Sequence, residues 1–204
     1  MKKILMTIAA AFVAVNMNAQ YYIGGSIGFQ TKTTPAATTE VTSTGFTFAP
    51  EIGMALDDTK SIGIILNYNS TKNETKYVGT ASGTPSVEAT VTNIQLRPYL
   101  RYQVLEYGKA NIFVDGGALL AFQSQKDMKA GMDLGLFLSP GIAFDINDKW
   151  SIAAHINDIF RFAYHKDPVA DVTGAPDAPT SMNLRASTGG FTTGNVTFGV
   201  YYNF

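Results

Sequence analysis

The residues of this chain that could do chemistry are mostly charged side chains set at alternate positions within apolar segments. Five of them form the candidate site: Glu51, Arg97, Arg101, Asp115 and Arg161. In extended chain, alternation with apolar neighbours turns these charges away from the apolar face. Opposite charges that share an interior should pair, because a buried unpaired charge is costly. The pattern predicts either a structural plug of ion pairs or a gated ion path in which Glu51 switches between Arg97 and Arg101.

Metal and cofactor chemistry have little support in the sequence. His155 and His165 are the only histidines, and one is expected in an interior while the other lies at the root of a loop. They are poor ligands for one metal, although Asp167 and Asp171 leave a weak cation site open in that loop. The chain has no Cys, which excludes disulfides, thiolate metal sites and an acylated Cys. We expect no metal, no cofactor and no nucleic-acid partner.

The elements that must position these charges are eight segments of alternating hydrophobicity. A stretch of about ten alternating residues is typical of a membrane-spanning strand. The eight predicted strands cover residues 21–31, 44–56, 61–72, 89–104, 110–122, 132–146, 150–164 and 190–204. Asp158 falls on the outward face of the seventh, so either a bulge turns it inward or the register slips there.

The connections between these strands alternate strictly between long and short. The long ones, rich in Thr, Ser, Gly and Pro, are residues 32–43, 73–88, 123–131 and 165–190. The short ones are 57–60, 105–109 and 147–149. Short periplasmic turns and longer external loops are typical of an up-and-down barrel in an outer membrane. The sequence therefore predicts an all-β fold, an eight-stranded antiparallel up-and-down transmembrane β-barrel.

An internal repeat supports this arrangement. Pro50, Pro98 and Pro140 each precede a short turn by seven or eight residues, within an alternating run. Proline cannot donate to a strand ladder, so their shared position indicates a bulge or an unpaired amide repeated from hairpin to hairpin.

Residues 1–19 are predicted to be a secretory signal peptide, and residues 20–204 the barrel domain. Lys2 and Lys3 precede a short apolar run, and Asn18-Ala19 offers a cleavage site. Charged residues make up 15% of the chain, well below the usual share of about 25% in soluble domains. Low charge argues against a soluble lipocalin-like barrel, whose exterior would be charged.

The last strand ends in NVTFGVYYNF, with Phe198, Val200, Tyr202 and Phe204 on its apolar face. This ending resembles the C-terminal signal by which outer-membrane barrels are recognised for insertion. Together with the LRPYLRY and LSPGIAF segments and the signal peptide, it resembles the outer-membrane β-barrel domain family. Its members are small eight-stranded porin-family proteins, similar in architecture to OmpX and to the barrel of OmpA.

The resemblance implies an outer-membrane location after Sec-type export. It implies contact with outer-membrane lipid and lipopolysaccharide, and with the barrel-assembly machinery during insertion. The expected role is structural, or an interaction through the external loops with partners that the sequence does not identify. A narrow pore for ions or small solutes is the alternative.

A lipid-modifying enzyme is a second alternative, because some barrels of this size deacylate lipid. The segment from Phe162 through His165 to Asp167 is similar to a Phe-x-x-His-x-Ser deacylase motif, but Asp167 stands in place of the serine. A Ser-His-carboxylate mechanism needs that nucleophile. We therefore expect no enzyme activity and no catalytic residue, unless a serine from elsewhere in the chain joins His165 and a carboxylate.

Overall fold

The computed structural model describes residues 20–36, 39–77, 86–156, 158–170, 177–186 and 196–204. The predicted signal peptide lies outside these residues. Within them, no helix is long and apolar enough to cross a membrane.

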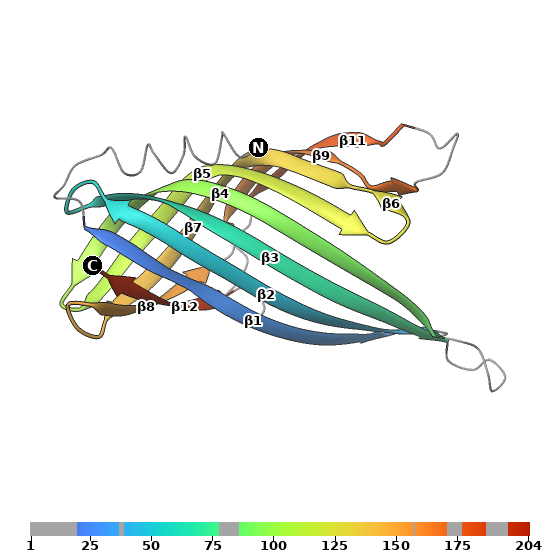
Figure 1. Ribbon diagram of the computed structural model, residues 1–204, viewed down its shortest axis with the longest axis horizontal. Helices are drawn as coiled ribbons and strands as arrows, with labels where there is room; N and C mark the ends of the chain where they lie inside the picture. Colours follow the sequence, from blue (N-terminus) through green and yellow to red (C-terminus); the bar gives the residue numbers. More distant parts are fainter. Residues whose placement is uncertain (1–19, 37–38, 78–85, 157, 171–176, 187–195) are drawn as a thin grey trace.

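Ten strands form one antiparallel sheet, and two more form a small separate one (Figure 1). The large sheet contains β1 (Tyr21–Pro35), β2 (Thr39–Ala55), β3 (Lys60–Tyr77), β4 (Val87–Tyr107), β5 (Ala110–Gln125), β7 (Gly131–Asp145), β8 (Trp150–Ile156), β9 (Phe160–Lys166), β11 (Thr180–Ala186) and β12 (Val196–Asn203). The small sheet pairs β6 (Met128–Lys129) with β10 (Val169–Ala170).

The sheet closes on itself, because β7 pairs with β8, β8 with β12, and β12 with β1. Two of the wall positions are each shared by two shorter strands. Strands β8 and β9 both pair with β7, while β11 pairs with β9 and β12 pairs with β8. Counted this way, the wall is the predicted eight-stranded antiparallel barrel, and the fold class is confirmed.

Two of the predicted external loops are wrong, because the chain continues there as strand. Residues 32–43 and 73–88 were expected to be loops, but β1 runs to Pro35, β2 begins at Thr39, β3 runs to Tyr77 and β4 begins at Val87. Strands β1–β4 therefore extend past the ends of β5 and β7 (Figure 1). Both faces of this extension are largely Thr, Ser, Asn, Lys and Glu. Because neither face is consistently apolar, the period-two signal is weak.

The other two long loops also contain strands. Strand β5 runs to Gln125 and β6 lies within the predicted loop 123–131, while β10 and β11 lie within the predicted loop 165–190. The predicted strand 190–204 begins later among the described residues, at Val196. The short turn 147–149 falls between β7 and β8 as expected, and 57–60 does so apart from its last residue, which begins β3. The turn predicted at 105–109 is shorter than expected, because β4 runs to Tyr107.

The strand ladder is interrupted on one side at each of the three repeated prolines. Pairing between β2 and β3 skips Pro50, and pairing between β4 and β5 skips Pro98. The partner of β7 changes from β9 to β8 across Pro140. A proline has no amide hydrogen to donate, so it sits where a strand can bend or break without losing a hydrogen bond.

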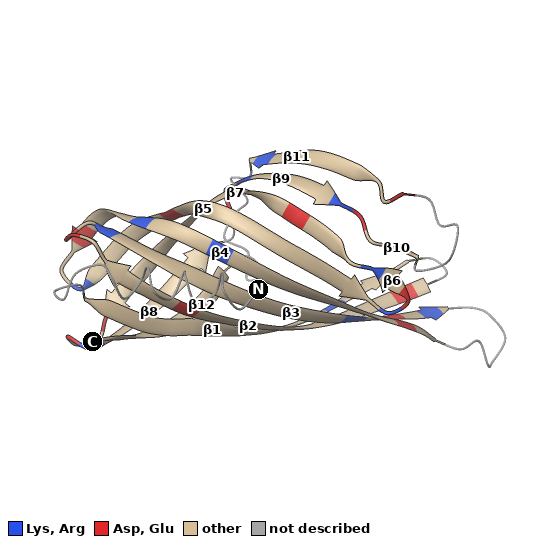
Figure 2. Cartoon of the chain, turned by 45° about the horizontal axis from the view of Figure 1, so that its top comes forward, with Lys and Arg blue, Asp and Glu red and all other residues tan. Residues whose placement is uncertain are grey.

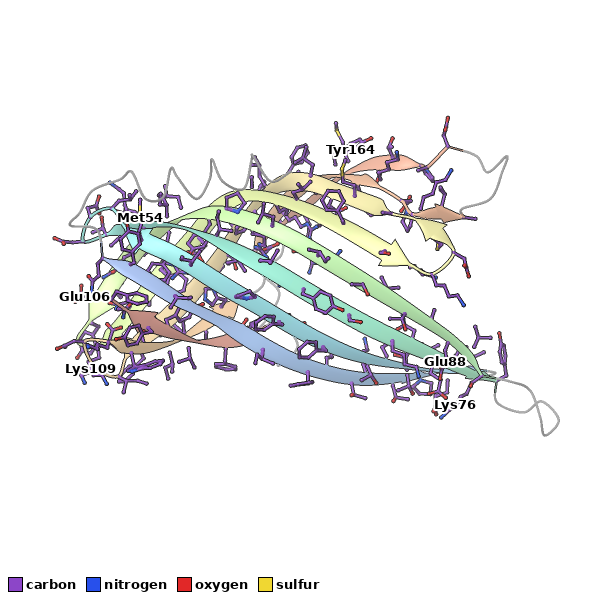
Figure 3. All side chains as sticks on the ribbon, in the orientation of Figure 1. Met54, Lys76, Glu88, Glu106, Lys109 and Tyr164 are labelled. Carbon is purple, nitrogen blue, oxygen red and sulfur yellow. The ribbon has the colours of Figure 1, made fainter. Side chains whose placement is uncertain are left out.

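The outer surface of the barrel wall is apolar. Residues such as Ile52, Leu100, Leu136 and Ile152 are 45–56% exposed, as lipid-facing side chains are when no lipid is present. Charged residues are instead found mainly toward the two ends of the strands, with a few between (Figure 2). Figure 3 marks these ends: Lys76 and Glu88 lie on the long extension, and Glu106 and Lys109 at the opposite end.

Candidate functional site: the interior of the barrel

Glu51 on β2 lies at the centre of the interior and is 4% exposed. The hydroxyl of Tyr99 on β4 donates to its Oε1, and the hydroxyl of Tyr201 on β12 donates to its Oε2 at 2.8 Å. Arg101 Nη2 donates to Oε1 at 3.0 Å. Strands β2, β4 and β12 are not neighbours in the wall, so these contacts cross the interior.

Arg101 joins this carboxylate to a second one. Its Nε and Nη2 donate to the two oxygens of Asp115 at 2.7 and 2.9 Å, a bidentate pair. Asp115 is 1% exposed, and its charge is balanced by this guanidinium. His155 Nδ1 lies 3.6 Å from Asp115, and its Nε2 lies 2.9 Å from the hydroxyl of Tyr201. Every charge of this cluster therefore has a partner, which is the condition for burying it.

Four aromatic rings pack between and below these charges, each over a glycine of the adjacent strand. The pairs lie directly opposite each other in the ladders: Tyr201 with Gly24, Tyr22 with Gly53, Tyr99 with Gly63, and Phe113 with Gly141. A methyl group added at any of these glycines would overlap the ring. The glycines make room for large rings in a barrel that is only wide enough for its own side chains.

Two cavities adjoin the cluster in the described part of the interior. One, of about 810 Å³, lies among the short turns that connect β2 to β3, β4 to β5 and β7 to β8, and it reaches Arg101, Phe113 and Tyr201. The other, of about 80 Å³, is lined by Glu51, Arg97, Asp115 and others. Tyr201 is the only described residue that lines both. It therefore lies at the boundary between the two spaces, next to the other side chains of the cluster.

The other two arginines of the candidate site are engaged elsewhere. Arg97 Nη2 lies 2.5 Å from Asp158, and its guanidinium stacks on Phe137 with 3.8 Å to the ring centroid. Arg161 Nη2 lies 2.8 Å from Asp133. The structure thus brings Glu51, Arg101 and Asp115 together and places Arg97 and Arg161 in two separate pairs.

The sequence left open whether a bulge or a register slip places Asp158, and the structure shows a break in the strand there. It lies in the interruption between β8 and β9, opposite Pro140, and its side chain is 13% exposed. The outward placement is wrong because the strand breaks there: Ile156 O accepts from the Ser139 hydroxyl at 2.6 Å, and Ile159 N donates to Leu138 O at 2.9 Å. The break turns Asp158 inward to Arg97.

Both ring nitrogens of His165 face carboxylates, because its Nδ1 contacts Asp133 and its Nε2 lies 2.8 Å from Asp167. Ser181 of β11 lies directly opposite His165 in the ladder. Because both nitrogens are engaged by carboxylates, neither is left to accept a proton from a serine hydroxyl in this arrangement. No group of three His, Asp or Glu residues suited to a metal ion occurs in the described part of the chain. Asp171, the fourth residue of the possible cation site, lies outside the described residues.

Sequence reasoning missed the tyrosines that complete the site. Tyr22, Tyr99 and Tyr201 lie on the interior face, where the pattern of charges drew attention instead. The signal that could have found them is the pairing of each with a glycine in the neighbouring strand.

The residues of the proposed C-terminal insertion signal face outward. Phe198, Val200 and Phe204 are 71%, 52% and 73% exposed. Tyr202 packs edge-on against Trp150 and Phe204, with 5.0 Å between ring centroids in each case. This apolar face continues the lipid-facing surface of the wall to the end of β12.

Comparisons with known proteins agree with this architecture. The chain is similar to the outer membrane protein OprG of Pseudomonas aeruginosa at 10% identity, with a TM-score of 0.52 and coverage of 91% of this chain and 96% of that one. It is also similar to Neisserial surface protein A at 12% identity, a TM-score of 0.46 and coverage of 91% and 97%. No curated protein sequence matches.

The family model of the outer membrane protein beta-barrel domain matches residues 4–204. This match covers nearly the whole chain and agrees with a closed barrel whose exterior is apolar and whose interior is polar. The chain therefore belongs to the outer membrane protein beta-barrel domain family.

Proposed function

We propose that this protein is an integral outer-membrane barrel with a closed interior, and that it acts through its external strands and loops. The observation that carries the proposal is the buried cluster around Glu51. Three hydrogen-bonded partners from β4 and β12 hold this carboxylate, and Tyr201 lies at the boundary between the two cavities. A fully paired buried network is rigid, which favours a plug over a gate.

The external extension of β1–β4 is the surface that we assign to the interaction role. From Tyr68 to Tyr77, β3 continues for nine residues, about 23 Å of height at about 3.3 Å per residue and a tilt of about 40°. Its strands are cross-linked by side chains: Ser43 donates to Asn73 at 2.7 Å, and Lys72 pairs with Glu88 at 2.8 Å. A rigid polar sheet raised above lipid is suited to contact another molecule, and function concentrates at such exposed segments.

Contact with outer-membrane lipid and lipopolysaccharide, and insertion by the barrel-assembly machinery, belong to the same proposal. The apolar wall and the outward row of Phe198, Val200, Tyr202 and Phe204 support it. Release of a signal peptide after Ala19 would precede insertion.

Two measurements test the proposal together. The first is conductance of the refolded wild-type barrel in a planar bilayer, for which we expect no steady openings. The second compares adhesion of cells to immobilised fibronectin, laminin and collagen when they carry the wild-type chain or a trimmed one.

The trimmed variant removes residues 31–44 and 71–91 and joins each cut with Asn-Gly, a favoured two-residue hairpin turn. Gln30 and Gly45 are paired across two strands in the wild type, as are Ser70 and Thr92. In the trimmed variant these two pairs directly flank the new Asn-Gly turns. We expect the trimmed barrel to remain folded by heat-modifiable gel migration and to lose adhesion. Steady wild-type openings would establish the pore instead, and unchanged adhesion of the trimmed variant would refute the assigned surface.

A further inference from the structure

The root of the last external loop is held by four polar side chains from β7, β9 and the residue after β9. His165 contacts Asp133 through Nδ1 and lies 2.8 Å from Asp167 through Nε2. Asp133 also accepts from Arg161 Nη2 at 2.8 Å. Neither the plug around Glu51 nor the external extension uses this network.

His165 lies above the membrane-spanning part of the wall. Its ladder partner Asp133 precedes Asp145, the last residue of the unbroken strand β7, by twelve residues. At about 3.3 Å per residue and a tilt of about 40°, this separation corresponds to about 30 Å of height, more than the apolar band of about 25 Å. The imidazole is therefore in contact with the external medium, and its side chain is 27% exposed.

The network controls where the loop goes next. Two residues after Asp167 the chain enters β10, where Val169 and Ala170 pair with Lys129 and Met128 of β6. The backbone N–H of Asp167 also donates to Pro179 O at 3.0 Å. The contact between His165 and Asp167 thus lies at the point where the chain turns from the wall toward β6.

Both contacts of His165 depend on a doubly protonated ring. Each nitrogen faces a carboxylate oxygen, which only accepts, so each must carry a hydrogen. The hydrogen bond to Asp133, followed by the one to Asp167, raises the pKa of His165 above its usual value. The other charged groups on the packed elements are Arg161 on β9, Arg185 opposite it on β11, and Lys129 on β6. These cations oppose the positive ring, whereas the two carboxylates favour it.

We propose that doubly protonated His165 is a latch that holds the loop after β9 against β6, and that a rise in pH releases it. The ring retains the hydrogen directed at Asp133, the less exposed carboxylate, and loses the one directed at Asp167. The nitrogen lone pair then faces the Asp167 carboxylate, and the root of the loop is freed from the wall.

The direction follows from proton linkage. The pKa of His165 is higher in the latched state than in the open state. Protonation of the ring therefore stabilises the latched state in full when the pH is below the open-state pKa. As the pH rises through the latched-state pKa, that support is lost. Between the two pKa values the ratio of latched to open molecules falls by up to about tenfold per pH unit.

Distance measurements between two spin labels test the latch in the full-length barrel in lipid nanodiscs. The chain has no native Cys, so spin labels attach only at cysteines that are introduced. We use Lys126→Cys and Ala170→Cys, because both positions are exposed and lie near the β6–β10 pair. At a pH below the ordinary histidine pKa of about 6.5 we expect one short, narrow distance distribution. Raising the pH should broaden it and shift it to longer distances, reversibly.

Three further changes on this labelled background make the test decisive. Asp167→Asn should give the broad distribution already at that lower pH, and His165→Gln should remove the pH-dependent transition. Asp177→Asn is the matched control, because it removes the same charge from an exposed position of the same loop and should behave as the wild type. Gel migration establishes that each variant is folded.

A wild-type distribution that stays narrow as the pH is raised, or an Asp177→Asn distribution that is already broad at the lower pH, would overturn the latch. The latch concerns loop conformation alone. It therefore fails or survives independently of whether the barrel conducts or adheres.

Discussion

Replacing Tyr201 should convert the closed barrel into an open one. Tyr201 is the only described residue that lines both interior cavities, and its hydroxyl is held by Glu51 and His155. Tyr201→Phe keeps the ring and removes the hydroxyl, whereas Tyr201→Ala removes both. Comparing the two variants shows whether the volume of the ring or the hydrogen bonds of the hydroxyl keep the interior closed.

The two variants should also differ in stability by a predictable amount. Tyr201→Phe leaves Glu51 with Tyr99 and Arg101 but deprives it and His155 of one partner, which costs about 1–3 kcal/mol. Tyr201→Ala adds a cavity in the buried interior, and large-to-small substitutions of aromatic residues cost about 3–5 kcal/mol. We therefore expect unfolding free energies to fall in the order wild type, Phe variant, Ala variant.

The assay is equilibrium unfolding in urea, followed by gel migration, together with conductance in planar bilayers. Wild type and Tyr201→Phe should be silent, and folded Tyr201→Ala should show openings. The neighbouring Tyr202→Ala, which faces outward, is the control and should remain silent. A folded Tyr201→Ala barrel that does not conduct would refute the assignment of the ring as the barrier, and openings in Tyr201→Phe would assign closure to the hydrogen bonds.

Three further predictions concern the packing of the wall and its turns. Gly24→Ala should lower the unfolding free energy, because the added methyl overlaps the ring on the next strand, whereas Gly28→Ala, with its nearest atom at 3.5 Å, should be close to neutral. Asp158→Ala should destabilise by about 3–5 kcal/mol in urea unfolding, since it leaves a largely buried arginine without its partner; Asp148→Ala in the exposed turn is its control. The backbone N–H and the hydroxyl of Thr59 donate hydrogen bonds to Asp57 and lower the pKa of its carboxyl group. The carboxylate therefore stabilises the folded barrel above its pKa in the unfolded chain. This stabilisation is lost as the pH falls through the pKa of the folded state. Unfolding of Asp57→Asn should therefore depend less on pH below about 4 than that of the wild type, and equal slopes would contradict this.

The membrane-spanning part of the fold could be predicted because lipid imposes a regular pattern. Apolar residues such as Ile64, Leu100 and Leu136 must face outward, so their alternation is visible in the sequence. Above the membrane that constraint ends. Thr33 on β1 pairs with Thr42 on β2 in a region where both faces meet water, and a polar sheet has no period to distinguish it from a loop.

The interior could be predicted only in part. The sequence identified Glu51, Arg101 and Asp115 as inward charges, but the choice of partner depends on register and on breaks in the strands. Arg97 pairs with Asp158 because the strand breaks opposite Pro140. The repeated proline and the outward charge both indicated an irregularity there, but neither identified Arg97 as the partner. In the deacylase-like segment, Asp167 stands at the position of the serine, and both ring nitrogens of His165 face carboxylates.

The position of the cluster explains why it is built from charges rather than from apolar side chains. The pairing between neighbouring strands is interrupted at mid-height, at Pro50 between β2 and β3 and at Pro98 between β4 and β5. Glu51 follows the first proline and Tyr99 follows the second. The hydrogen bond between these two side chains therefore crosses the interior beside both interruptions. Directional hydrogen bonds fix the spacing between opposite walls, whereas apolar contacts between them would permit sliding. A cluster with this bracing role must stay paired, and for this reason we assign Glu51 and Arg101 to holding the barrel in shape and not to gating it.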